Sequence, residues 1–414
     1  METGFDSEDR KMSKDRENGK GRKFDLLLKD GEIIDPAQGF HGKGSIAIQD
    51  GKIAAVGPNL LEGEAEDVLD MRGKILSPAL IDVHCHPAQW FSWLGVPPDE
   101  VGLNTGVILL GDGGTAGAAN FEALKKLVVE PAQTEVLCFL NVAKAGLISI
   151  PEIHTIHDID LEHSKQVVEA NRPYIRGIKL RVIEPLAEGV GLKGMEVAKK
   201  LASDLHLPLM IHIGEPRERM PKDPMDDFSR AAVSLLEAGD ILSHFMTWEP
   251  GGMILKDGTI YPELEKARQR GVFLDSCHGL WHFNFTIARQ ALAKGFKPAI
   301  ISTDMSAMNL SIVQSLPVTM SKFLNLGLTL DEAIAMTTIH PARAIREESR
   351  LGSLQVGMPA NITVFELLKG DFLFGDGKGR ESMRGNLLLE PRMVFKKGER
   401  HPAYSRYQIP PILK

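Results

Sequence analysis

Leu80-Ile81-Asp82-Val83-His84-Cys85-His86 is a largely apolar run that ends in two histidines separated by one residue. Such a run is typical of a buried β-strand, and side chains at positions i and i+2 of a strand lie on the same face. Two imidazoles at the end of one strand can therefore bind one metal ion without a change in the backbone. A pair of hydrogen-bonded structural histidines is the alternative interpretation.

The same pattern of an apolar strand followed by a helical segment recurs through residues 76–345. The predicted strands end near the following residues: His84, Asp112, Asn141, Lys179, His212, His244, His278 and Asp304. Their spacing of about 26 to 38 residues suits one strand, one loop and one helix each time, which predicts a (β/α)8 TIM barrel. A doubly wound open sheet is the competing arrangement, but no glycine-rich phosphate-binding fingerprint follows the first strand.

Both flanks of this region are predicted to be β-rich. In residues 24–75 the pairs Asp30-Gly31 and Asp50-Gly51 each separate two apolar runs, which predicts two hairpins. In residues 346–400 strands are predicted at 362–365 and 392–395. The middle of the chain and its flanks therefore differ in secondary structure.

The composition of the chain excludes several classes of protein. It is 43% hydrophobic and 25% charged, which is ordinary for a globular protein, and its net charge of −7 argues against a general nucleic-acid binder. The sequence contains no run of about 18 apolar residues, so no membrane span is predicted. Residues 1–23 predict a flexible charged tail without a secretion signal, and residues 401–414 a C-terminal tail. Three widely spaced cysteines, Cys85, Cys138 and Cys277, fit a reducing cytoplasm better than a disulfide framework.

Lys179 is unusual because it lies inside the apolar strand 175–182. A lysine directed into a barrel loses its hydration, so its amine tends to be neutral and nucleophilic. A neutral amine can add carbon dioxide, and the resulting carbamate can bridge two cations. An ion pair with a nearby carboxylate is the alternative.

Three further strand ends carry metal-binding residue types. His212 and His244 each end an apolar strand, and Asp304 ends the last one, where it can also cap the following helix. Barrel closure brings all the strand ends to one rim. Together with the earlier residues they predict two sites for divalent metal ions, with zinc as the default and manganese or iron as alternatives.

These residues, in this order, resemble the amidohydrolase superfamily, specifically its members with two metal ions and a carboxylated lysine. The resemblance also covers residues 77–82, 337–342 and 352–357. Residues 114–121, Lys179-Leu180-Arg181 and Cys277-His278-Gly279 are similar to the narrower amidohydrolase/deacetylase or dihydroorotase-like branch. Ala79 and Asn361 depart from the family pattern, although neither position is a ligand.

The resemblance implies a fold and a ligand set. The fold is a (β/α)8 barrel with a small β-sandwich domain built from both ends of the chain. His84, His86 and Asp304 are expected to hold one metal ion, and His212 and His244 the other. Lys179, as N6-carboxylysine, is expected to bridge them.

The resemblance also implies a reaction. A metal-bridging hydroxide is expected to attack a carbonyl group, with Asp304 as the catalytic base and then acid. Arg181 and His278 are candidate substrate-binding residues, although an internal ion pair is an equal alternative for Arg181. Five residues of the long loops are further candidates for a pocket wall: Trp90, Trp93, His154, His157 and Trp248.

The expected activity is hydrolysis of an amide or acyl ester of a small molecule, as in a deacetylase. A cyclic amidase of the dihydroorotase type is the first alternative. A non-catalytic assembly protein is the second, but such relatives typically lose metal ligands, and this chain keeps the full set. A homo-oligomer is expected from the family, whereas no nucleic-acid or membrane partner is expected.

Overall fold

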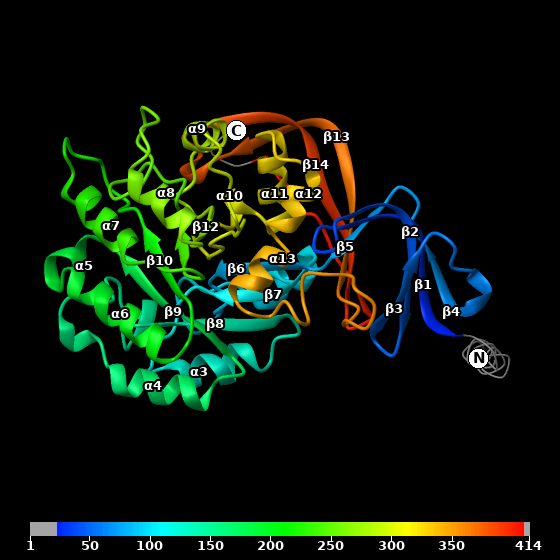
Figure 1. Ribbon diagram of the computed structural model, residues 1–414, viewed down its shortest axis with the longest axis horizontal. Helices are drawn as coiled ribbons and strands as arrows, with labels where there is room; N and C mark the ends of the chain where they lie inside the picture. Colours follow the sequence, from blue (N-terminus) through cyan, green and yellow to red (C-terminus); the bar gives the residue numbers. More distant parts are fainter. Residues whose placement is uncertain (1–22, 410–414) are drawn as a thin grey trace, which may run out of the picture.

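The apolar runs of the middle region form one parallel sheet in the computed structural model, which describes residues 23–409 (Figure 1). Its strands are β6 (Leu80–Cys85), β7 (Val107–Asp112), β8 (Glu135–Asn141), β9 (Ile175–Val182), β10 (Leu209–Ile213), β11 (Ile241–Ser243) and β12 (Phe273–Asp275). Each strand pairs with the next one in the chain. Every residue of β6, β7 and β10 is buried, as expected for parallel strands covered on both faces.

Residues 300–305 lie between the two ends of this sheet. Ile300 forms a parallel bridge with Asp275 of β12, and Met305 forms one with Cys85 of β6. The backbone N–H of Asp304 also donates to the carbonyl of His84 at 2.6 Å. The sheet is therefore curled, and its first and last strands approach the same segment. The predicted α/β class is confirmed.

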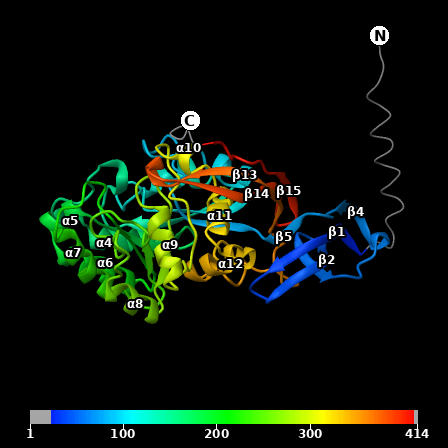
Figure 2. The same ribbon diagram turned by 90° about the horizontal axis from the view of Figure 1, so that it is seen from above.

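Helices follow most strands of this sheet and cover its outer face (Figures 1 and 2). They are α2 (Pro98–Val101), α3 (Phe121–Leu124), α4 (Leu161–Ala170), α5 (Glu184–Gly189), α6 (Leu192–Asp204), α7 (Pro224–Ser234), α8 (Pro262–Gln269), α9 (Phe285–Ala293), α10 (Leu310–Val313), α11 (Leu316–Asn325), α12 (Leu330–Ala335) and α13 (Ile339–Ala344). Helix α6 buries Met195, Ala198, Leu201 and Ala202, which share one face at helical spacing. Asp160, Asn284 and Ser315 cap α4, α9 and α11.

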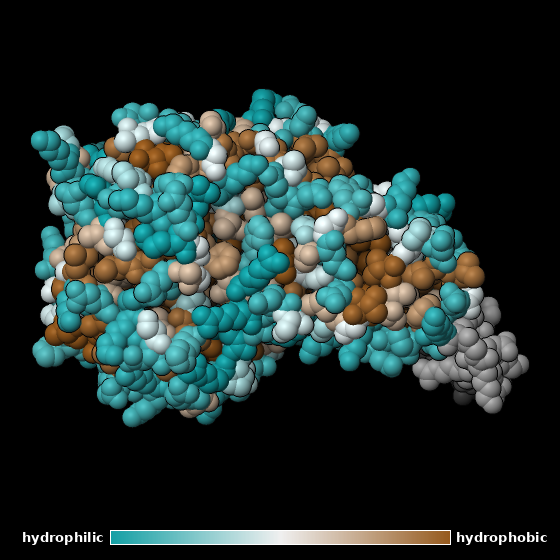
Figure 3. Space-filling model, in the orientation of Figure 1, coloured by the Kyte–Doolittle hydropathy of each residue, from teal (hydrophilic) through white to brown (hydrophobic). Residues whose placement is uncertain are grey.

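Short helical turns occupy some of the connections. Those of the 3-10 type are η1 (Glu62–Glu64), η2 (Leu103–Thr105), η4 (Gly146–Ile148), η5 (Ile156–Asp158) and η6 (Gly377–Gly379), and η3 (Lys125–Val129) is a π-helical turn. No helix of the described residues is long and apolar enough to cross a membrane. Hydrophilic and hydrophobic residues are interspersed over the face seen in Figure 3.

A second sheet combines strands from both ends of the chain. It contains β1 (Phe24–Asp35), β2 (Phe40–Gln49), β3 (Lys52–Gly57), β4 (Ala65–Asp70), β5 (Ile75–Pro78), β13 (Ile362–Gly375), β14 (Ser382–Lys396) and β15 (Glu399–Pro402). Strand β5 joins the halves, because it pairs in parallel with β1 and antiparallel with β13. Only Ala79 separates β5 from β6, so this sheet anchors the strand that carries His84. Strands β1, β2 and β4 lie at the end of the molecule opposite α5 to α8 (Figure 2).

One of the two predicted hairpins is correct, and the other is wrong. Asp50 and Gly51 join β2 to β3 with φ values of 50° and 71°, as a type I′ turn requires. Asp30-Gly31 instead lies inside β1, where the register against β2 shifts between Leu28 and Gly31. Asp30 has a φ of 61°, so the left-handed conformation that could make a turn is used in a bulge.

The predicted tails fall mostly at the limits of the described residues. The tail at 1–23 lies outside them except for Lys23. Part of the predicted tail at 401–414 packs on the protein: β15 extends to Pro402, and the hydroxyl of Tyr407 accepts from the backbone N–H of Leu373 at 2.9 Å. Residues 410–414 lie outside the described residues.

Candidate metal centre

The side chains predicted to bind metal converge at the carboxyl ends of the parallel strands. A cavity of about 240 Å³ opens there, and five of them line it: His84, His86, Lys179, His212 and Asp304. The sixth, His244, follows β11 directly and is fully buried. Parallel strands that curl bring their ends to one rim, so residues up to 220 positions apart become neighbours.

The first group of donors surrounds Asp304. Its Oδ1 lies 3.1 Å from Nε2 of His86 and 3.7 Å from Nε2 of His84. The amine of Lys179 lies 3.0 Å from the same Nε2 of His84. Nδ1 of His86 is held by the hydroxyl of Thr115 at 2.8 Å, which leaves Nε2 directed at the group.

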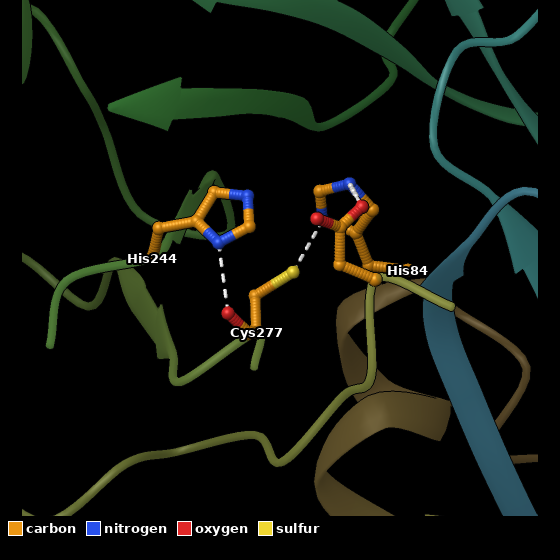
Figure 4. A group of neighbouring side chains, drawn as sticks. His84, His244 and Cys277 are labelled. Carbon is orange, nitrogen blue, oxygen red and sulfur yellow. Dashed lines mark hydrogen bonds and ion pairs between the residues drawn. The ribbon is translucent and has the colours of Figure 1, made fainter. Parts of the chain in front are cut away.

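Cys277 was not predicted to be part of this site. Its Sγ lies 3.0 Å from Nδ1 of His84, and its carbonyl accepts from Nδ1 of His244 at 2.8 Å (Figure 4). It therefore orients two of the predicted histidines from one loop. Among the described residues, His84, His244, Cys277 and Asp304 form one group with ligand atoms close enough to hold a metal ion.

Two buried carboxyl groups hold the segment that ends at Asp304. Asp82 accepts from the N–H of Thr303 at 3.1 Å and from its hydroxyl at 2.5 Å. Asp275 accepts from the hydroxyl of Ser302 at 2.8 Å. Burial raises the pKa of both carboxyl groups to about 7. These bonds place Asp304, whose φ is 51°, above the ends of the strands.

Burial and charge give these side chains the protonation states that metal binding requires. Burial would raise the pKa of Asp304, but the hydrogen bond from His86 and the neighbouring histidines hold it well below its usual range. Burial lowers the pKa of Lys179 to about 8, so a neutral amine is accessible near neutral pH. Burial also lowers the pKa values of His84, His212 and His244 well below the usual range, which keeps their lone pairs free.

The second group of donors contains a histidine that the sequence analysis missed. His212, His244 and His282 are all buried, and one ring nitrogen of each lies within 4.8 Å of the others. Nε2 of His212, Nε2 of His244 and Nδ1 of His282 are buried and have no hydrogen-bond partner. The only sequence signal was a second histidine four residues after His278, in the loop that follows β12.

His278 does not line the cavity, so its predicted role in substrate binding gains no support from the structure. It is fully buried and stacks on Phe283 at a ring separation of 4.6 Å. Its Nδ1 donates to the carbonyl of Gly279, and its Nε2 accepts from the amine of Lys322 at 2.7 Å. Both ring nitrogens therefore have protein partners, and neither is available to a ligand.

Arg181 does line the cavity, two residues after Lys179 on β9. Its Nη1 donates to Oε2 of Glu152 at 3.1 Å, and only 2% of the Glu152 side chain is exposed. The internal ion pair considered for Arg181 is thus present.

Most of the other cavity residues are apolar. Of the five predicted wall residues only Trp93 lines the cavity, and Trp90 is 92% exposed. Trp281 lies in the cavity wall instead. The remaining apolar wall residues are Leu94, Leu147, Ile150, Pro216, Leu280 and Met308.

The donor set fits divalent metal ions. Buried histidine nitrogens without a hydrogen-bond partner are costly, at about 1–3 kcal/mol each, unless a ligand satisfies them. Here three such nitrogens face one another beside a cluster of two histidines, a lysine and a carboxylate. Imidazole and carboxylate donors of this kind suit zinc, manganese or iron.

Comparison with known proteins shows the family to which the chain belongs. Residues 75–400 match the model of the amidohydrolase family. A deacetylase from Agrobacterium fabrum is 32% identical over 362 residues, which cover 86% of each chain. A deacetylase from Brucella anthropi is 32% identical over 348 residues, which cover 83% of this chain and 84% of the relative.

Solved structures give the same result. A dihydroorotase is 30% identical with a TM-score of 0.80, over 92% of this chain and all of the other. An adenine deaminase is 28% identical with a TM-score of 0.82, over the same shares of the two chains. On the family match and these similarities, the chain belongs to the amidohydrolase family.

Proposed function

We propose that this protein is a metal-dependent hydrolase that removes an acyl group from a small molecule by cleaving an amide or ester bond. The observation that carries the proposal is the convergence of His84, His86, Lys179, His212 and Asp304 on one cavity, with His244 directly behind it. The deacetylase names of the two relatives, which are similar over more than four fifths of the chain, support an acyl group as the part removed.

Two metal ions, most simply zinc, are proposed for this cavity. His84, His86 and Asp304 would hold one, and His212 and His244 the other. Lys179, carboxylated by carbon dioxide, would contact both. The fold proposed around them is a closed (β/α)8 barrel in which residues 300–305 serve as the eighth strand, together with a small β-sandwich domain. When bound, such ions ionise water near neutral pH and polarise a carbonyl group.

The protein's own residues handle the proton and the substrate. Asp304 lines the cavity and is ionised because its pKa is held below its usual range, so its carboxylate has a lone pair that can accept a proton from water and pass it to the leaving nitrogen or oxygen. Arg181 remains a candidate for contact with a polar substrate group, although Glu152 already neutralises its charge. The rest of the cavity wall is largely apolar and includes Trp93 and Trp281.

Cleavage of a cyclic amide is the second candidate activity. It is supported by the structural similarity to a dihydroorotase and by a local match of 41% over 61 residues to the dihydroorotase of Aquifex aeolicus. That match covers only 15% of the chain, whereas the deacetylases match most of it. Acyl removal is therefore the leading proposal. The predicted cytoplasmic location and homo-oligomer stay predictions.

Metal analysis and a substrate panel test the proposal. The purified protein is expected to contain about two metal ions per chain and to hydrolyse some N-acyl amino acids or O-acyl hydroxy acids. Cyclic ureides are included in the panel to test for the second candidate activity.

Labelling with ¹³C-bicarbonate is expected to give a carbamate signal in NMR that is lost in Lys179→Met. Asp304→Asn is expected to lower turnover at least a hundredfold, whereas Asp227→Asn, on the exposed face of α7, leaves it unchanged. A protein that takes up no metal contradicts the proposal.

A further inference from the structure

We propose that His282 is a third imidazole ligand of the metal position formed by His212 and His244. This inference rests on the proposed function, because it concerns the metal centre of the same cavity. It adds a ligand from the loop after β12, a part of the chain to which the predicted ligand set assigns none.

The geometry of the three rings supports a shared ligand. The ring centroid of His282 lies 4.6 Å from that of His212 and 4.3 Å from that of His244, and the last two centroids lie 4.3 Å apart. One nitrogen of each ring lies within 4.8 Å of the others. Nitrogens bound to one zinc ion at about 2.0–2.1 Å in a tetrahedral arrangement lie about 3.4 Å apart, so small rotations of the rings suffice.

The hydrogen bonding of the histidines points the same way. Nδ1 of His244 is already used by the carbonyl of Cys277, so Nε2 is the nitrogen left for a ligand. Nδ1 of His282 is buried and has no hydrogen-bond partner, although only 3% of this residue is exposed. His278, in the same loop and equally buried, has partners on both ring nitrogens. The loop can therefore satisfy a buried imidazole, and it leaves Nδ1 of His282 free.

The structure also holds His282 in this position from both sides. The carbonyl of Phe283 accepts from the N–H of Gly377 at 2.9 Å, and the amide of Asn284 donates to Asp376 at 2.8 Å. Gly377 and Asp376 belong to the tip of the β13–β14 hairpin, which thus supports the loop from outside. On the inner side lies Gly214, directly after β10, where a Cβ atom would lie 2.9 Å from Nδ1 of His282. The absence of a side chain keeps that nitrogen clear.

The number of protein ligands at each metal position also supports a third histidine beside His212 and His244. His84, His86 and Asp304 supply three protein ligands to one metal ion, whereas His212 and His244 supply only two to the other. With His282 both positions have three ligands besides Lys179. Because the neighbouring Trp281 lines the cavity, a metal ion bound by His282 would also fix this part of the cavity wall.

Metal affinity and spectroscopy test the inference without reference to activity. The metal-free protein is titrated with Co²⁺ against a chromophoric chelator, for the wild type, His282→Asn and the control His163→Asn on the exposed face of α4. Loss of a partner that only orients a ligand weakens metal binding by about 10–100-fold. We therefore expect His282→Asn to bind one of the two ions at least about tenfold more weakly, and His163→Asn to bind both as the wild type does.

Paramagnetic NMR of the Co²⁺-loaded wild type, with ¹⁵N-labelled histidine, provides a second measurement that needs no variant. Five metal-bound imidazoles are expected, and one of them is expected to be missing in His282→Asn. Four in the wild type, or unchanged affinity for both ions in His282→Asn, would overturn the inference and leave the proposed function intact. A wild type that binds no metal would instead contradict the proposed function. If His282→Asn does not fold, the number of metal-bound imidazoles in the wild type alone tests whether His282 is a ligand.

Discussion

Replacement of Lys179 by methionine is expected to change stability in opposite directions with and without metal. Methionine fills nearly the same volume as the lysine stem but has no amine. In the metal-free protein Lys179 is 1% exposed, and burial lowers the pKa of its amine from 10.5 to about 8. A base whose pKa is lower in the folded state destabilises the fold wherever it is protonated in the unfolded state.

The size of this effect follows from the two pKa values. The gap between 10.5 and about 8, at about 1.36 kcal/mol per pH unit, corresponds to about 3 kcal/mol at pH 7. The variant also loses the contact between the amine and Nε2 of His84 at 3.0 Å, which offsets about 1 kcal/mol. Lys179→Met is therefore expected to be about 2 kcal/mol more stable than the wild type at pH 7. The destabilisation falls as pH rises from 8 towards 10.5, so the difference should shrink to about 1 kcal/mol at pH 9.

Urea unfolding of chelator-treated protein in buffer free of carbon dioxide measures this difference. Lys200→Met, on the exposed face of α6, is the control and is expected to stay within about 0.5 kcal/mol of the wild type. With metal and bicarbonate present the order should reverse, because the wild type gains the free energy of metal binding and the variant loses a bridging ligand. A metal-free Lys179→Met that is less stable than the wild type at pH 7, or a stability difference that does not change with pH, would show that the buried amine does not destabilise the fold.

Three further predictions concern neighbouring parts of the site. Gly114 has a φ of +88°, and a Cβ atom there would lie 2.6 Å from Cγ of Lys179. Gly114→Ala should therefore destabilise the protein by about 1–3 kcal/mol and lower its metal content. An unchanged melting temperature and metal content would contradict this. Burial lowers the pKa of Lys322 to about 7, so its amine destabilises the fold at pH 7 and does so less as the pH rises. In urea unfolding, the stability of the wild type relative to Lys322→Met should therefore rise by about 2 kcal/mol from pH 7 to pH 9. A difference that stays constant over this pH range would contradict the prediction. Removal of metal by a chelator should lower the unfolding free energy by about 8 kcal/mol, about 4 kcal/mol for each of the two ions, when each is supplied at about 1,000 times its Kd, and readdition should restore it. Thermal unfolding with and without chelator measures this.

The strand pattern and the residues at the strand ends could be predicted from the sequence. Alternation along a strand puts His84 and His86 on one face, and this depends only on residues two positions apart. Apolar runs of a few residues likewise predicted the strands that carry Lys179, His212 and Asp304, and the structure brings these side chains to one cavity, although β9 continues past Lys179 to Val182. Their assignment as metal ligands stays a prediction.

Turn chemistry was less reliable, because one local conformation serves two structures. Asp30 and Asp50 both adopt positive φ before a glycine, yet only Asp50 lies in a turn. What decides between turn and bulge is the partner strand: β1 continues because it pairs along its length with β2, β4 and β5. Such pairing joins residues far apart in sequence, so the local pattern does not contain it.

The order of the strands and the residue types near their ends follow from periodicities of a few residues, so both could be predicted from the amino-acid sequence. Which histidine of the loop after β12 faces the cavity depends instead on packing between distant parts of the chain. From the sequence only His278 was a candidate, but in the structure its Nε2 accepts from the amine of Lys322 on α11. The curl of the sheet instead brings His282 against His212 and His244. The physical reason is that a loop side chain is oriented by the elements that pack around it, and these come from distant parts of the chain.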